Sequence, residues 1–486
     1  MEIKIPKCMS TQHPDNVTTP FFSESPEIGG DDEITEAYYA FSHLGCDEQM
    51  WDCEGKEVDN FVVKKLLTRY DSFFSENILG RDVFITLRVP NPLFERDEAK
   101  ILIETLESIP RSFDTARIFY QKDIAPIFEI ILPLTTSATC LNRIYWYYRD
   151  FVYGKQYIKF RNDDCTIAEW IGDFNPSTIH IIPLFEDWDH ILIAEQIVKE
   201  FLRDKDFKYI RVFFARSDPA MNYGMISAVL LNKIALQRMY KLSEEIGVEI
   251  YPIIGVGSAP FRGNMKPSTV ERILKEYPSA HTFTIQSAFK YDNSPDEVRE
   301  AIKKIRSRSK GLPHMVDEER ALEIMKKYTQ AYRGHIKNLA NLINEVAKYV
   351  PKRRRRKLHV GLFGYPREVE GIKLPRVITF TAALYSIGIP PEVLGLEVLD
   401  KEDIRFLKTV YVNFEEDIFD ALSYLDIENK YLPEEIRKSV HKLDFSSFNV
   451  EHIKISRKII EFLKDGKYDN VQEEVLRAAY LRKFLG

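Results

Sequence analysis

Short apolar runs and longer amphipathic stretches alternate through the first three quarters of this chain, and this alternation most restricts its fold. The short runs are rich in Val, Ile and Phe and almost continuously apolar, as in strands buried on both faces of a sheet. Alternation of strands with helices predicts a parallel sheet covered by helices. We expect eight strands, which suits a closed (β/α)8 barrel, at 46–52, 82–88, 127–134, 179–185, 209–215, 249–256, 281–285 and 358–363.

The pattern changes after about Pro366, where strands stop and helical segments follow at 376–387, 415–425, 455–463 and 471–484. No linker rich in Gly, Ser or Pro separates the two parts. The predicted class is α/β, a TIM-type barrel with additional helices, mainly C-terminal, packed on it. We expect one domain over 1–486, composed of an N-terminal arm (1–45), the barrel (about 46–375) and a helical part (about 376–486).

The composition favours a soluble protein of the cytoplasm. The 486 residues are 44% hydrophobic and carry a net charge of −6, which argues against binding of polyanions over the whole surface. The five cysteines form no CxxC pair and are odd in number, as expected of reduced thiols. We find neither a signal sequence nor an apolar run of about 18 residues, so we expect no membrane partner.

One charge run stands apart, Lys-Arg-Arg-Arg-Arg-Lys at 352–357. It follows a helical segment, and cations interact favourably with a helix C-terminus, so a solvated helix end is the expected role. An anion or nucleic-acid patch is the alternative. Zinc-ligand spacing and interleaved aromatic residues are missing, so we expect no nucleic-acid partner.

Polar side chains gather where the predicted strands end, which is where a barrel carries its chemistry. Each alone has an ordinary explanation, because an arginine there often forms a surface ion pair and a carboxylate often caps a helix. Two carboxylates with nearby oxygen donors can also hold Mg²⁺ or Mn²⁺, and arginines bind carboxylate and phosphate through paired hydrogen bonds. The sequence predicts a metal-and-anion site for a small phosphorylated or carboxylated substrate, made by Arg88, Glu186, Asp218, Arg262, Arg367 and Arg376.

A histidine near the start of the chain lies in the sequence Met-Ser-Thr-Gln-His-Pro-Asp-Asn, at 9–16. Pro14 favours an extended backbone at His13, and the Asp-Asn pair that follows favours a turn. A surface or capping histidine is the ordinary interpretation of a single His-Pro pair. A histidine held just before a turn is also well placed to meet a ligand. Because His13 precedes the first predicted strand, the arm has to fold back over the barrel to bring it to the rim.

With this octet and the sequence Met-Trp-Asp-Cys-Glu-Gly-Lys at 50–56, the chain resembles the archaeal-type phosphoenolpyruvate carboxylase family. The resemblance runs from Lys7 to about Gly395. It implies irreversible β-carboxylation of phosphoenolpyruvate with bicarbonate to oxaloacetate and phosphate, via carboxyphosphate and a metal-stabilised enolate. Such a reaction supplies C4 dicarboxylic acid anaplerotically. The resemblance also implies Mg²⁺ or Mn²⁺ as cofactor and a homotetramer.

The larger plant and bacterial enzymes of this kind add expectations for single residues, because their motifs are similar to segments of this chain. Met221 stands where they have a lysine, and Val256 where their glycine-rich loop has an arginine, so those roles are not carried over. The resemblance implies catalytic roles for His13, Arg88, Arg262, Arg367 and Arg376, substrate binding by Gly257, Ser258, Gly263 and Gln286, and metal binding by Glu186 and Asp218.

The resemblance further implies that His13 accepts a proton as carboxyphosphate breaks down. Water destroys both intermediates, so we expect the glycine-rich segment 257–264 to close as a lid. Two other functions stay open. One is another barrel enzyme of phosphoenolpyruvate or pyruvate enolate chemistry that uses no bicarbonate. The other is a non-catalytic anion or nucleic-acid binder acting through 352–357.

Overall fold

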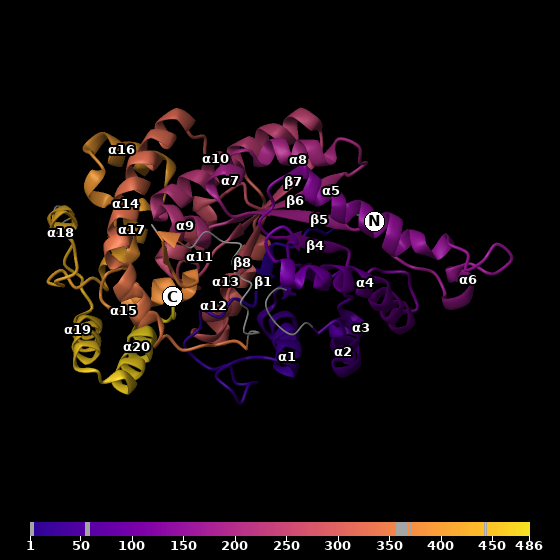
Figure 1. Cartoon of the computed structure of the whole chain (residues 1–486), viewed down its shortest axis with the longest axis horizontal. Coiled ribbons are helices and arrows are strands. Elements are labelled where there is room, and N and C mark those ends of the chain that lie inside the picture. Colours follow the sequence, from indigo (N-terminus) through magenta and orange to yellow (C-terminus); the bar gives the residue numbers. More distant parts are fainter. Residues whose placement is uncertain (1–3, 54–58, 356–367, 370, 442, 444) are drawn as a thin grey trace.

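Eight parallel strands form a closed barrel in a computed structural model of the chain, which describes residues 4–53, 59–355, 368–369, 371–441, 443 and 445–486 (Figure 1). Neighbours in the barrel follow chain order, and β1 pairs with both β2 and β8 to close it. The α/β barrel prediction is confirmed. The strands are β1 (Cys8–Ser10), β2 (Glu48–Asp52), β3 (Phe84–Arg88), β4 (Glu129–Leu132), β5 (His180–Phe185), β6 (Tyr209–Ala215), β7 (Glu249–Gly255) and β8 (Thr282–Ile285).

Barrel closure differs from the sequence prediction. Seven predicted strands correspond to β2–β8, but the barrel begins at Cys8–Ser10, inside the predicted N-terminal arm. The predicted strand at 358–363 lies outside the described residues. Three residues are too few to show an alternating pattern, and β1 is held by pairing, with Met9 opposite both Glu48 and Thr284. His13 therefore follows a barrel strand directly, and no arm has to fold back to bring it to the rim.

Helices surround the barrel and extend it on the C-terminal side (Figure 1). Gly224, at φ 83°, separates α9 from α10. The helices are α1 (Asp31–Tyr39), α2 (Val62–Arg69), α3 (Asp71–Glu76), α4 (Ala99–Tyr120), α5 (Ala138–Trp146), α6 (Ile167–Ile171), α7 (Trp188–Leu192), α8 (Ala194–Leu202), α9 (Ser217–Tyr223), α10 (Met225–Ile246), α11 (Val270–Glu276), α12 (Ser287–Tyr291), α13 (Pro295–Ser307), α14 (Glu318–Ala347), α15 (Val377–Ser386), α16 (Lys401–Val410), α17 (Phe414–Leu422), α18 (Glu434–His441), α19 (Val450–Asp465) and α20 (Tyr468–Arg482).

The C-terminal helices pack on the barrel rather than standing apart from it. Helix α15 contacts α9 and α14 and also the C-terminal helices α19 and α20. No single helix among the described residues is long and apolar enough to cross a membrane. One bent pair, Val377–Ser386 with Pro391–Val398, meets that requirement by length and composition only, at an angle of 89°, and most of its residues are buried.

Two layers of side chains fill the barrel interior, a polar layer and an apolar layer that lies against the pocket described next. Arg211, fully buried, donates to Glu48 at 2.7 Å and to Glu129 at 2.8 Å, which satisfies both carboxylates. An apolar cluster that includes Met50, Leu184 and Phe213 lies elsewhere inside the barrel, and these three residues also line the pocket described next. The functional pocket therefore rests on an apolar floor.

Candidate active site

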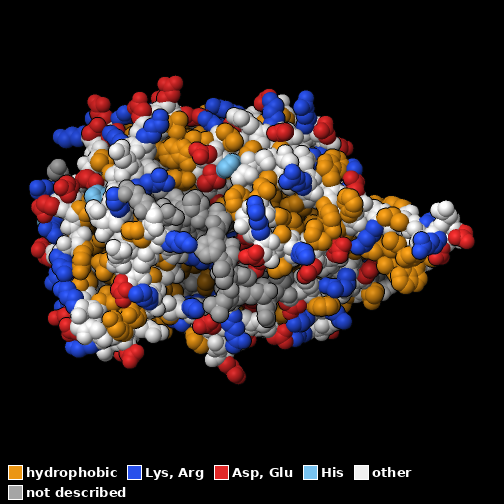
Figure 2. All heavy atoms as spheres, in the orientation of Figure 1, with side chains coloured by type: hydrophobic (Ala, Val, Ile, Leu, Met, Phe, Trp, Pro, Cys, Tyr) orange, Lys and Arg blue, Asp and Glu red, His pale blue; other side chains and the backbone are white. Residues whose placement is uncertain are grey.

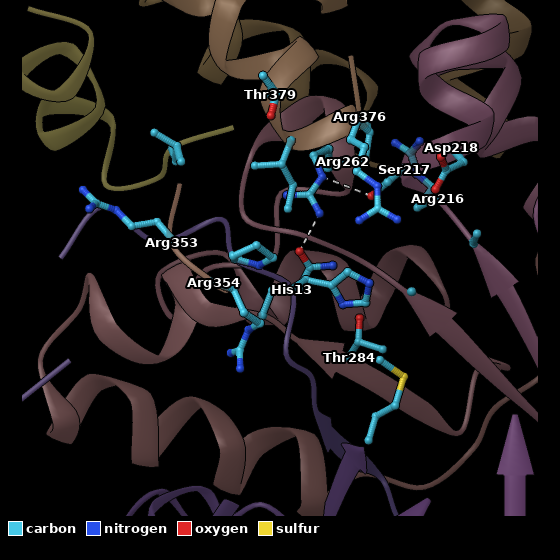
Figure 3. A pocket seen from close by; sticks show the side chains of 18 of the residues that line it. His13, Arg216, Ser217, Asp218, Arg262, Thr284, Arg353, Arg354, Arg376 and Thr379 are labelled. Atoms are coloured by element: carbon cyan, nitrogen blue, oxygen red, sulfur yellow. Dashed lines mark hydrogen bonds between the residues drawn. The ribbon is translucent and has the colours of Figure 1, made fainter. Parts of the chain in front are cut away.

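A cavity of about 440 Å³ opens at the carboxyl ends of the barrel strands. Its lining comes from residues within β2, β3 and β5–β8 and from the segments that follow β1 and β5–β8, together with residues 350–354 and the start of α15. Figure 3 shows His13 between Thr284 and the group formed by Arg262, Ser217 and Arg376. The structure brings together seven of the residues predicted from sequence, namely His13, Arg88, Glu186, Asp218, Arg262, Gln286 and Arg376.

The imidazole of His13 is oriented from the barrel side by Thr11. Its Nδ1 lies 2.9 Å from the Thr11 hydroxyl, and that hydroxyl lies 3.4 Å from the carbonyl oxygen of Ile285. A hydroxyl has one proton, and Ile285 can only accept, so the Thr11 oxygen accepts from Nδ1–H of His13. In this tautomer Nε2 carries the lone pair, as a proton acceptor requires.

Arg88 is held by a carboxylate that the sequence analysis did not single out. Asp52, the last residue of β2, accepts from Nε of Arg88 at 3.0 Å and from Nη2 at 2.8 Å. Asp52 is 1% exposed. The backbone amide of Asp52 in turn donates to the side-chain oxygen of Gln12 at 2.9 Å. Because Gln12 precedes His13, this chain of contacts connects the octet to Arg88.

Arg262 is almost fully buried and makes contacts in several directions. Its Nε donates to Ser217 at 3.2 Å, its Nη2 to Gln286 at 2.5 Å, and its Nη1 to the carbonyl oxygen of Gly486 at 2.6 Å. Asp15 lies 3.3 Å from the same Nη1. Burial lowers the pKa of the Arg262 guanidinium, and the Asp15 carboxylate opposes that shift. The guanidinium is therefore fixed in place before any ligand arrives.

The predicted substrate-binding residues Gly257, Ser258 and Gly263 are not among the residues that line the cavity. A Cβ on Gly257 would lie 2.8 Å from the guanidinium carbon of Arg262. Gly263 has φ 118°, and a Cβ there would lie 2.5 Å from Val256. The amide of Ser258 donates to Asp15 at 3.3 Å. These three residues shape the loop that carries Arg262.

The glycine-rich loop is buried and anchored to the C-terminal helices. The amide of Phe261 donates to Glu392 at 2.5 Å, and Asn264 donates to Asp417 at 2.7 Å. Burial raises the pKa of both acceptor carboxyl groups to about 7. Gly257–Asn264 thus lies inside the protein, and its Arg262 lines the cavity. Closure of this segment as a lid stays a prediction.

The two predicted metal ligands share the cavity. Glu186 follows β5 and accepts from the amide of Leu134 at 2.8 Å, while Asp218 lies in the first turn of α9. Within the described residues no group of three or more His, Cys, Asp or Glu side chains converges on one point. Two carboxylates beside an open cavity fit Mg²⁺ or Mn²⁺, because such a cation keeps several waters and takes its other ligands from substrate.

The basic run differs from its prediction. Arg353 and Arg354 are buried, 6% and 3% exposed, and line the cavity together with Lys352. Backbone hydrogen bonds join this segment to Ile28, whose amide donates to the Arg353 carbonyl at 3.0 Å. A solvated helix end is therefore the wrong interpretation for these two arginines. Residues 356 and 357 lie outside the described residues.

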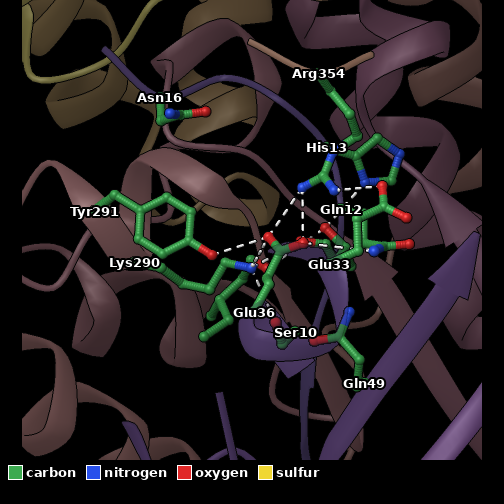
Figure 4. Close-up of polar contacts among 12 residues, drawn as sticks. Ser10, Gln12, His13, Asn16, Glu33, Glu36, Gln49, Lys290, Tyr291 and Arg354 are labelled. Carbon is green, nitrogen blue, oxygen red and sulfur yellow. Dashed lines mark hydrogen bonds and ion pairs between the residues drawn. The ribbon is translucent and has the colours of Figure 1, made fainter. Parts of the chain in front are cut away.

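Arg354 belongs to a buried ionic cluster centred on Glu36 (Figure 4). Glu36 accepts from Arg354 at 2.8 Å and from Lys290 at 3.1 Å. Burial alone would raise the pKa of Glu36, but Arg354 and Lys290 outweigh it and hold the value at about 2. Lys290 also donates to the Thr11 carbonyl at 3.0 Å. The cluster therefore supports the octet from behind.

Several residues of the site were missed or cannot be placed. Arg216, fully buried, lines the cavity beside Asp218, and its position directly after β6 could have singled it out. Asp52 ends the predicted strand 46–52 and could have been singled out in the same way, whereas Asp15 and Glu36 carried no strand-end signal. Met221, whose role the sequence left open, is buried away from the cavity lining. Arg367 lies outside the described residues.

Comparison with known proteins identifies relatives over the whole chain. The family model described as phosphoenolpyruvate carboxylase matches residues 5–486. Curated proteins of that name from Methanothermobacter thermautotrophicus and Methanospirillum hungatei are each 56% identical over 484 residues, covering 100% of both chains. The protein of that name from Pyrococcus furiosus is 50% identical over 486 residues, covering 99% of this chain and 100% of its own.

Proposed function

Because the chain belongs to the phosphoenolpyruvate carboxylase family, its reaction is the carboxylation of phosphoenolpyruvate, and we propose that the cavity around His13 carries it out. The family prediction made from the two N-terminal motifs is confirmed. One observation supports the location: a histidine, two carboxylates and several arginines meet in a single cavity at the carboxyl end of the barrel.

The reaction has three steps. A phosphoryl group passes from the enol oxygen of phosphoenolpyruvate to an oxygen of bicarbonate, leaving an enolate and carboxyphosphate. Carboxyphosphate then gives up its proton. The bond between its carbon and the oxygen that bridges carbon and phosphorus breaks, which releases CO₂ and phosphate. Carbon three of the enolate attacks CO₂ and forms oxaloacetate.

His13 receives the proton that carboxyphosphate releases. The contact with Thr11 leaves Nε2 as the basic nitrogen, and the ring lies in the cavity where bicarbonate has to bind. The tautomer is set before substrate arrives, because Thr11 is fully buried and hydrogen-bonded to Ile285.

The arginines supply fixed positive charge for the transferring phosphoryl group. Arg88 and Arg262 are rigid, since Asp52 holds the first and Gln286 and Ser217 hold the second. Fixed cations stabilise charge that spreads over phosphoryl oxygens without reorganisation during the reaction. Arg376, the N-cap residue of α15, is the third arginine of this group.

Glu186 and Asp218 would hold the divalent cation that the family uses, and we propose Mg²⁺ or Mn²⁺ as that cation. A cation bound there supplies a Lewis acid for the substrate's carboxylate and enol oxygens. Leu134 fixes one carboxylate oxygen of Glu186 through its amide, so the carboxylate keeps its orientation.

We further propose a homotetramer of the cytoplasm that acts on small molecules, without nucleic acid or membrane as partner. The family resemblance supports the tetramer, and the net charge of −6 disfavours a nucleic-acid partner. Arg353 and Arg354 lie in the cavity wall, which also weakens the alternative of a binding surface at 352–357.

An oxaloacetate assay tests the proposal. The purified protein should form oxaloacetate from phosphoenolpyruvate only when both bicarbonate and Mg²⁺ or Mn²⁺ are present. Phosphate release at the full rate without bicarbonate would instead favour a phosphotransferase or enolate lyase.

A further inference from the structure

A segment between α5 and β5 projects from the barrel (Figure 1). This projection (residues 147–174) contains the helical turns Tyr147–Tyr153 and Gly154–Tyr157 and ends in α6. Backbone hydrogen bonds order it: Ile167 donates to Ile158 at 3.0 Å, and Phe160 donates to Cys165 at 3.3 Å. Thr166 and Glu169 form a capping box at the start of α6. The projection is therefore a folded element rather than a loose loop.

The projection is unusually apolar for an exposed element. Helix α6 has the sequence Ile-Ala-Glu-Trp-Ile, yet none of its residues is buried. Figure 2 shows hydrophobic side chains gathered along this part of the molecule. Large exposed apolar patches mark interaction surfaces in soluble proteins. The exposed side chains are Phe151 (64%), Tyr157 (66%), Ile158 (58%), Phe160 (46%), Trp170 (68%) and Ile171 (57%).

A groove of about 390 Å³ lies between α2 and α4. Its walls are largely apolar, with Ile118 70% exposed and Phe61 48% exposed. The guanidinium of Arg111 lies 4.2 Å from the centre of the Phe61 ring, and Lys64 also lines the groove. The base of the projection packs against α4 as well, so the α2–α4 groove and the projection flank the same helix.

Charge and area favour a second copy of this chain as the partner. The projection carries four cations and five acidic side chains, with four of the acids in its outer part at 159–173, whereas the groove lining carries two cations and no acid. An aromatic side chain buries about 150–250 Å². The four exposed aromatic residues of the projection are 46–68% exposed, so together they offer roughly 500 Å². This is more than half of the about 800 Å² that one side of a standard interface needs.

We infer that two copies of the chain associate by inserting the projection of each into the α2–α4 groove of the other. A two-fold axis makes the contact twice, so a protruding element and a groove on one chain become a closed, symmetric interface. This inference deepens the assembly proposed above by naming one of its surfaces, and it concerns residues outside the active-site cavity.

Mass measurement by light scattering after size exclusion tests the inference on the full chain. The double variant Trp170→Glu, Ile171→Glu should have a smaller mass than the unchanged protein, with the same far-ultraviolet circular dichroism. Ile118→Arg, in the groove, should reduce the mass in the same way. Neither projection residue is buried, so loss of folding is not expected.

The matched control is Leu312→Glu, Met315→Glu, which places two charges at exposed apolar positions elsewhere (67% and 62% exposed) and should leave the mass unchanged. A monomeric unchanged protein at micromolar concentration would overturn the proposed assembly itself. An oligomer that keeps its mass in the projection variant or in the groove variant would overturn the interface inferred here and leave the assembly standing.

Discussion

Asp52 accepts two hydrogen bonds from Arg88, from Nε at 3.0 Å and from Nη2 at 2.8 Å. The two residues end neighbouring strands, where Asp52 lies opposite Arg88 in the register of β2 and β3. Parallel pairing therefore places an acceptor beside the guanidinium at the rim of the barrel. The two parallel hydrogen bonds fix the orientation of the Arg88 guanidinium, which lines the cavity.

Asp52→Asn should lower kcat/KM for phosphoenolpyruvate by about 100-fold, because Arg88 loses its charged anchor and misplacement of a catalytic group is costly. Steady-state kinetics measure this loss. Asp31→Asn is the control, since Asp31 is exposed and pairs with Lys65 and Arg69 away from the cavity. Equal activities of the Asp52 variant and the unchanged enzyme would show that Arg88 needs no anchor.

His13→Asn should keep phosphate release from phosphoenolpyruvate and lose oxaloacetate formation by about 10²–10⁴-fold, the range of general base catalysis. The first step does not need the proton acceptor, whereas the second does. Parallel assays of phosphate and oxaloacetate separate the two products. A variant that carboxylates at the normal rate would remove His13 from the mechanism.

Thr11→Val should lower kcat about tenfold with little change in KM. Valine has nearly the shape of threonine but cannot accept from Nδ1 of His13, so the imidazole proton is no longer confined to that nitrogen. The dependence of kcat on pH should shift as well, which a packing defect alone would not cause. An unchanged pH profile would contradict the role assigned to Thr11.

Glu186→Gln and Asp218→Asn should each raise the concentration of Mg²⁺ or Mn²⁺ needed for half-maximal activity by more than about tenfold. Metal titrations of the oxaloacetate assay measure this change. Asp187→Asn is the matched control, because Asp187 accepts from the His190 amide at 3.1 Å as a helix cap and does not line the cavity. Metal titrations equal to those of the unchanged protein would show that Glu186 and Asp218 do not bind the metal.

The Glu36 cluster should make stability depend on acidity. The pKa of Glu36 is held at about 2, below its ordinary value of 4.5, so the folded state favours the ionised form. This contribution, about 3 kcal/mol by the size of the shift, is present above about pH 5 and disappears as pH falls toward 2. Urea unfolding at several pH values measures it. The difference between the unchanged protein and Glu36→Gln should be constant above pH 5 and shrink below it.

The sequence by itself determined the architecture and the main charged groups of the cavity wall. Continuously apolar runs separated by helical patterns report burial on both faces, and this local signal located β2–β8. Strand ends meet at one rim in any such barrel, so Arg88, Glu186, Asp218, Arg262 and Gln286 could be grouped without coordinates.

Only the tertiary structure decided how the barrel closes and what supports the site. The strand Cys8–Ser10 is too short to carry a period, and its partners β2 and β8 define it. Arg354 belongs to a basic run for which we expected a solvated helix end. In the structure its side chain is buried and forms ion pairs with Glu33 and Glu36, more than 300 positions away in the chain. Periodicity records the local environment of a segment, whereas a buried ion pair depends on which distant segments the fold brings into contact.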